Sequence, residues 1–210
     1  MAQWTNSSGS WMRPYRNPWG APQIKYYQES TAASSAVIKV GDLVRNNTVV
    51  TTGGQRVKRD PSTGGGGANL AHIGGAQLLG IAVEGSTSDG GVTGLVDDSS
   101  GGGVGAARSR LIGVAVADGL TEFLGYFKSG GAGATPIAAS SLIGLNRAVV
   151  YDSTLARYFV DSTNSTAADA FVKITDFPSD ALGDSGGVPV VFKFLSSNIH
   201  TAVAIGDVKV

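Results

Sequence analysis

Short runs of apolar residues, separated by glycine-rich and polar stretches, make up most of the chain after residue 36. The runs have the length of strands, and helical periodicity is nearly absent, so the pattern favours β-strands over helices. It predicts an all-β fold with a β-sandwich or barrel-like body. In the second half of the chain, the predicted strands cover residues 111–117, 122–128, 148–151, 157–161, 171–175, 188–195 and 201–210.

Nearer the N-terminus, residues 37–50 predict a hairpin-like pair of strands with two asparagines, 46 and 47, at the turn. Two further segments, 60–77 and 85–110, are dominated by Gly, Ser and Asp. Such residues bury little surface and lose much backbone entropy on ordering. We therefore expect long surface loops in both places.

One apolar segment recurs. Residues 78–83, Leu-Leu-Gly-Ile-Ala-Val, return as Leu-Ile-Gly-Val-Ala-Val at 111–116, and 142–145 form a fainter copy. Each copy has Gly at the third position of an otherwise apolar run, where a missing side chain permits a bulge or the close approach of another backbone. We expect these segments to be core strands that are covered on both faces.

The first 28 residues differ from the rest in composition. They hold all three Trp and six of the sixteen aromatic residues, no acidic residue, and three prolines that argue against a helix. Trp, Tyr and Arg dominate binding hot spots. We expect an extended arm over residues 1–30 that docks on another copy or a partner and whose deletion leaves a folded body, 31–210; a loose tail and an arm folded onto its own domain stay open. The expected contact residues are Trp4, Trp11, Arg13, Tyr15, Arg16, Trp19, Tyr26 and Tyr27.

Composition and charge exclude several classes of site. The 210 residues include no Cys, which excludes disulfides and thiolate chemistry, and only two His, so we expect no metal and no cofactor. Sixteen basic residues balance sixteen acidic ones, which does not suggest a nucleic acid or an anionic membrane as a partner. No segment has the pattern of an export signal or a membrane span, so synthesis in the cytoplasm is expected.

Charge is unevenly distributed along the chain. Residues 1–60 hold eight basic and three acidic side chains, whereas residues 61–210 hold eight basic and thirteen acidic ones. Opposite charges of this kind steer one surface onto another during association. The imbalance is consistent with contacts between copies or with an acidic partner.

The motif Gly-Asp-Ser-Gly-Gly at 183–187 spells the nucleophile signature of chymotrypsin-like serine proteases, in which Ser is activated by a His that an Asp orients. His72 precedes Ser185 as that family requires, and Asp97, Asp98 or Asp118 would supply the acid. However, Val188 precedes the proline that should follow the motif directly, and such a shift by one residue turns strand side chains to the opposite face. We interpret the motif as a tight turn and predict no catalytic residue.

Four segments carry a likeness to a known class of protein: Val-Gly-Asp-Leu-Val at 40–44, Leu-Gly-Ile-Ala-Val at 79–83, and the runs at 144–152 and 157–160. With the aromatic arm and the Gly-rich loops, the chain resembles the capsid decoration (cement) proteins of tailed bacteriophages. The resemblance implies a non-enzymatic virion protein on the capsid surface that bridges neighbouring capsomers. Its partners would be the major capsid protein and further copies of itself, in a homotrimer.

Two alternatives from other classes stay open. One is another virion component: a head fibre, a tail tube or a minor capsid protein. The other is a chymotrypsin-like serine protease that uses the motif at 183–187.

Overall fold

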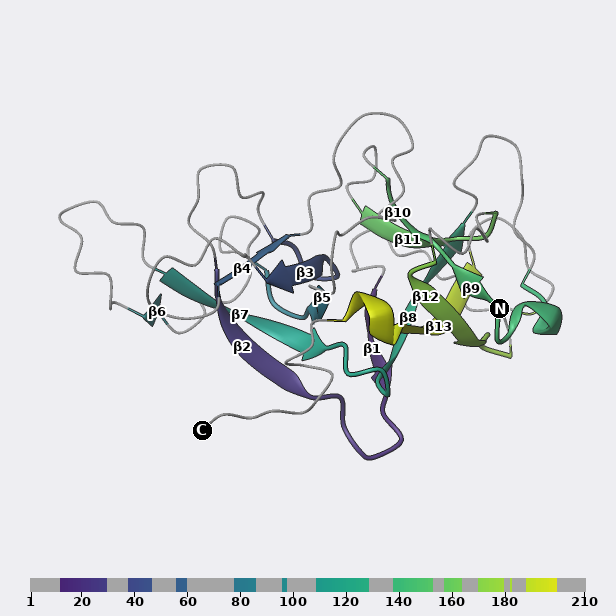
Figure 1. Ribbon diagram of the computed structural model, residues 1–210, viewed down its shortest axis with the longest axis horizontal. Helices are drawn as coiled ribbons and strands as arrows, with labels where there is room; N and C mark the ends of the chain where they lie inside the picture. Colours follow the sequence, from purple (N-terminus) through teal and green to yellow (C-terminus); the bar gives the residue numbers. More distant parts are fainter. Residues whose placement is uncertain are drawn as a thin grey trace.

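The computed structural model describes residues 12–29, 38–46, 56–59, 78–85, 96–97, 109–128, 138–152, 157–163, 170–179, 182 and 188–199. The regular elements of these residues are strands and short 3-10 helices, with no α-helix among them. The predicted all-β fold is therefore confirmed. In Figure 1 the strands form two groups that lie side by side along the long axis of the molecule.

The first group is a sheet that closes on itself, and we call it the first barrel. Around the ring, β2 pairs in parallel with β4, β4 with β3, β3 with β5, β5 with β7, and β7 with β2, the last four antiparallel. A short strand, β6, pairs with the first two residues of β7. The strands are β2 (Ile24–Glu29), β3 (Leu43–Asn46), β4 (Arg56–Arg59), β5 (Leu78–Ala82), β6 (Val96–Asp97) and β7 (Ser109–Val116).

The second group, the second barrel, is closed by one bent stretch of chain. Residues 146–152 pair with β12 through β9 and with β11 through β10, so they join the two ends of the sheet. Between these ends, β11 pairs in parallel with β8, β8 with β13, and β13 with β12. The strands are β8 (Glu122–Lys128), β9 (Asn146–Arg147), β10 (Val149–Asp152), β11 (Arg157–Asp161), β12 (Val172–Asp176) and β13 (Val188–Phe194), with 3-10 helices η3 (Ser140–Leu142) and η5 (Ser196–Asn198).

The two barrels have the same topology. If β2, β3, β4, β5 and β7 are matched in chain order with β8, the β9–β10 stretch, β11, β12 and β13, every pairing and its direction agrees. The registers agree as well: Ile81 pairs with Leu43 and Ala115, and Lys173 pairs with Asn146 and Lys193. The chain is therefore a tandem pair of one five-stranded architecture.

The turn that leads into the second strand of each barrel is also repeated. Gly41 N donates to Ala82 O at 2.8 Å, and Gly144 N donates to Ile174 O at the same distance. The two glycines have φ of 90° and 89°, a conformation that favours Gly because it has no Cβ. The match extends through these loops and supports the equivalence of the barrels.

Buried apolar side chains from both barrels form one continuous cluster. In the second barrel its centre is aromatic: the ring centroids of Phe123 and Phe194 are 5.1 Å apart, and those of Phe192 and Phe194 are 5.4 Å apart, both edge to face. In the first barrel aliphatic residues fill the same role, and all five residues of β5 are buried. The core thus joins the barrels into one body.

The glycine expectation is confirmed at Gly80. The related segments 78–83 and 111–116 form neighbouring antiparallel strands, and a Cβ on Gly80 would lie 1.9 Å from Ala115 O. A bulge in the pairing of β5 with β3 lies at the same place. The fainter copy at 142–145 is not a strand but the end of η3 and a turn, and its Ile143 and Leu145 are exposed. The expectation of a core strand was wrong there.

Most predicted strands of the second barrel agree with the structure to within two residues at each end. The predicted hairpin at 37–50 differs, because residues 38–42 form a turn and β3 pairs with the later strands β4 and β5. The expected loops at 60–77 and 85–110 lie mostly outside the described residues, except that 96–97 and 109–110 belong to strands. The predicted strand at 201–210 also lies outside them.

The structure differs most from the sequence prediction at the N-terminus. Residues 24–29 form β2, an integral strand of the first barrel, and residues 13–16 form β1 (Arg13–Arg16), which pairs with β8 of the second barrel. This part of the expected arm, 12–29, is folded onto its own chain, so no boundary separates it from the body. The expected single body is itself two barrels. Residues 1–11 lie outside the described residues.

Candidate partner-binding surface

Residues 13–29 form a strap that connects the barrels, with β1 on the second barrel and β2 on the first (Figure 1). The chain reverses between these strands at a tight turn, in which Gly20 N donates to Asn17 O at 3.1 Å. Pro18 and Gly20 suit this turn, since Pro fixes φ and Gly20 has a φ of 132°. The strap therefore presents one short turn at the junction of the barrels.

Asn17 connects this turn to a second turn at 118–121. Its side-chain Nδ2 donates to Thr121 Oγ1 at 2.9 Å and to Asp118 Oδ2 at 3.3 Å, and its Oδ1 accepts from Trp19 N at 2.9 Å. Asp118 Oδ1 in turn accepts from the backbone N of Leu120 and of Thr121, at 2.9 and 2.6 Å. We call 17–20 and 118–121 the paired turns. Their hydrogen bonds hold both in fixed conformations.

The paired turns expose apolar side chains. Trp19 is 83% exposed and Leu120 is 45% exposed, although the residues that anchor them are partly or fully buried. A large aromatic side chain on a fixed turn loses little entropy on binding, and Trp is the residue type most enriched in hot spots. This combination is typical of a contact point for another protein.

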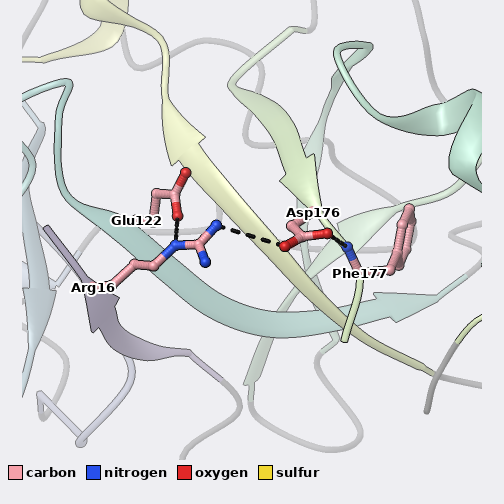
Figure 2. A network of polar contacts seen from close by, with 4 residues as sticks. All are labelled: Arg16, Glu122, Asp176 and Phe177. Atoms are coloured by element: carbon pink, nitrogen blue, oxygen red, sulfur yellow. Dashed lines mark hydrogen bonds and ion pairs between the residues drawn. The ribbon is translucent and has the colours of Figure 1, made fainter. Parts of the chain in front are cut away.

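Arg16 fixes the strap to the second barrel beside the paired turns, as Figure 2 shows. Its Nε bonds to a Glu122 carboxylate oxygen, and its Nη2 lies 3.5 Å from Asp176 Oδ2. Asp176 Oδ1 also accepts from Phe177 N at 2.9 Å. The Glu122 bond raises the pKa of Arg16 above its usual value, so the guanidinium stays charged. Because Arg16 is half exposed, this network contributes orientation more than stability.

The other predicted contact residues are divided between surface and core. Tyr15 is exposed with the Arg16 guanidinium over its ring, and Tyr26 is exposed and donates to Glu84 at 3.3 Å. Tyr27 packs against the core, and burial raises the pKa of its hydroxyl. Arg13 is exposed on β1. Trp4 and Trp11 lie outside the described residues, and the role of all eight residues in binding stays a prediction.

Leu120 was missed by the sequence interpretation. It stands alone between polar residues, 101 positions after Trp19, so only the pairing of β1 with β8 brings the two turns together. The signal available in the sequence was Asp118-Gly119, a turn-forming pair between the predicted strands 111–117 and 122–128.

We expect Asn17→Ala to destabilise the protein by about 1–3 kcal/mol, because it leaves the buried Thr121 hydroxyl without its Asn17 donor. Urea denaturation followed by circular dichroism measures the change. Trp19→Ala on the same turn is the matched control, and it should shift the free energy of unfolding by less than about 0.5 kcal/mol. Equal stability of Asn17→Ala and the wild type would show that the side chain does not anchor the turns.

The residues considered for a protease do not form a site in the described part of the chain. Ser185 and His72 lie outside it, and both carboxylate oxygens of Asp118 are engaged in the paired turns. Asp97 pairs with Ser109 at the edge of the first barrel. That Ser185 is no nucleophile stays a prediction.

Among the described residues, no group of three or more His, Cys, Asp or Glu side chains is placed to hold a metal ion. No helix in the same residues is long and apolar enough to cross a membrane. Searches with protein-family models, curated proteins and solved structures give no match to this chain.

Proposed function

We propose that this protein is a non-enzymatic structural protein of a virion, a capsid decoration protein that binds the outside of a phage capsid and cements neighbouring capsomers. The observation that supports this role best is the exposure of Trp19 on the anchored paired turns. The sequence resemblance is the basis for three parts of this proposal: the capsid as the binding site, the major capsid protein as the partner, and the homotrimer.

The architecture suits such a role physically. Two barrels with a shared core and a strap across their junction make a stiff body, in which a contact surface keeps its shape under load. A cementing protein needs several such contacts, and it gains from multivalency because each further contact forms at high effective concentration. Copies in a trimer would present the paired turns three times on one particle.

The test is attachment to shells that lack the protein. Trp19→Ala should weaken attachment by about 30-fold or more, because the loss of a hot-spot aromatic costs about 2 kcal/mol or more. Occupancy is measured by densitometry of the shell and decoration bands after sedimentation, over a range of added protein. In the complete virion the copy number should be comparable to that of the shell protein, whereas a tail or fibre component would be far rarer.

Leu182→Ala is the control, since Leu182 is a large apolar residue that is 47% exposed and does not belong to the paired turns. It should attach like the wild type. Attachment of Trp19→Ala at wild-type affinity would remove the paired turns from the docking surface.

A further inference from the structure

A groove lies on the outer face of the second barrel, where β12 and β13 run side by side. Its volume is about 470 Å³, within the range of ligand sites. Lys173 and Lys193 line it from the two strands, and they are direct cross-strand partners. The turn with Ile143 and Gly144 forms one wall, Leu195 and Ser196 form another part of the lining, and Gly119 of the paired turns lies at its edge.

Two lysines directly opposite each other are unfavourable in a sheet, because like charges in a cross-strand pair repel. No carboxylate forms an ion pair with either lysine among the described residues. The two acidic groups on the neighbouring strand ends, Glu122 and Asp176, are both bound by Arg16 (Figure 2). Arg16 offsets only one of these two negative charges, but neither carboxylate lines the groove, whose charged lining residues are the two lysines.

Thr175 lines the same groove and carries a polar group without a partner. Its Oγ1 is buried yet makes no hydrogen bond, although its residue lines the groove beside Lys173 and Ile174. A buried hydroxyl without a partner costs free energy, and native proteins rarely leave one unsatisfied. In this structure the hydroxyl oxygen is shielded from solvent, so a ligand in the groove would contact the exposed part of the Thr175 residue and not this atom.

The tandem architecture shows how the same face is used in the other barrel. By register, Lys173 and Lys193 occupy the positions of Ile81 and Ala115 in the first barrel. Those two residues are completely buried, whereas Lys173 is exposed and Lys193 is partly buried. The face that is packed in the first barrel is therefore open in the second, and its apolar pair is replaced by two cations.

We propose that this groove binds an extended acidic segment of a partner protein, with carboxylates at Lys173 and Lys193 and an apolar side chain against Ile143 and Leu195. Charge complementarity determines the choice of partner. A single small anion would leave most of the groove and its apolar walls empty. A nucleic acid requires a longer row of cations and exposed aromatic rings for stacking, and the groove offers two lysines.

The experiment measures binding of a fluorescent peptide that alternates Glu and Val to the full chain, by anisotropy at low and at raised salt. Lys173→Glu and Lys193→Glu should each weaken binding by about tenfold or more, because each substitution removes one charge-assisted contact to the peptide. Thr175→Val should leave binding unchanged and should not lower the stability of the free protein, since it removes a shielded, unpaired hydroxyl at nearly constant shape. Raised salt should weaken the wild-type complex.

Lys25→Glu, the same charge change on β2 of the first barrel, is the matched control and should bind like the wild type. The proposal fails if the two groove variants bind the peptide as tightly as the wild type, or if a Gln-Val peptide or an oligonucleotide binds equally well. Trp19 does not line the groove, so Trp19→Ala should leave peptide binding intact, and a failure of this test can be told apart from a failure of the shell-attachment test.

Discussion

Deletion of residues 2–28 is expected to unfold the first barrel. The deletion removes nearly all of β2, which pairs with β7 over residues 24–28 and closes the ring against β4. Without β2, the edges of β4 and β7 and the apolar core between them are exposed to water. Hydrogen exchange followed by mass spectrometry should show loss of protection in β3, β5 and β7, while β13 in the second barrel stays protected.

Deletion of residues 2–11 alone is the control, because every described strand remains in it. It should keep the protection of both barrels. If the longer deletion leaves β5 and β7 as protected as in the full chain, then β2 is dispensable, and the original expectation of a removable arm is correct after all.

Gly80→Ala is expected to cost about 3 kcal/mol or more. The added Cβ would lie 1.9 Å from Ala115 O and 2.9 Å from its carbonyl carbon, both of them backbone atoms of the paired strand β7. No rotamer change relieves such a clash, so the strands must separate where the first barrel is most completely buried. Thermal and urea unfolding measure the loss.

Gly144→Ala separates this clash from backbone strain. Gly80 and Gly144 both have a positive φ, 157° and 89°, but a Cβ on Gly144 meets nothing within 4 Å. The substitution should cost only the strain of about 1–2 kcal/mol that a side chain adds in a left-handed conformation. Equal losses in the two variants would mean that the close approach at Gly80 is relaxed by a small backbone shift.

Local pattern predicted the strands of the second barrel well, because 122–128 and 157–161 are short apolar runs with polar residues at both ends, and their apolar residues are buried on both faces. Gly80 was also informative, since a glycine in an apolar strand has few explanations other than close backbone approach. These features depend on neighbours in sequence or on one adjacent strand.

The tandem architecture was not visible in the sequence. The repeat found there, 78–83 and 111–116, relates two neighbouring strands of one barrel, whereas the true counterpart of β5 is β12. Leu-Leu-Gly-Ile-Ala and Val-Lys-Ile-Thr-Asp share almost no residues. Backbone hydrogen bonds preserve the register, and side chains on the outer face are free to change with their surroundings.

The strap was misjudged for a related reason. Residues 24–28 carry Ile-Lys-Tyr-Tyr-Gln, whose alternation is weak because Ile24 and Tyr26 face solvent and only Tyr27 packs inward. The aromatic residues of this segment predicted a binding arm, but one of them, Tyr27, packs against the core. The paired turns depend on contacts between residues about 100 positions apart, which no local pattern records.

The strap also constrains the order of events during synthesis. β1 leaves the ribosome before the other described strands, yet its partner Glu122 follows Arg16 by 106 residues, so β1 must wait while the first barrel forms around β2. Closing so long a loop costs entropy, and contacts of high sequence separation form late. The N-terminal strand is thus among the last to settle, and its docking joins two barrels that are built one after the other.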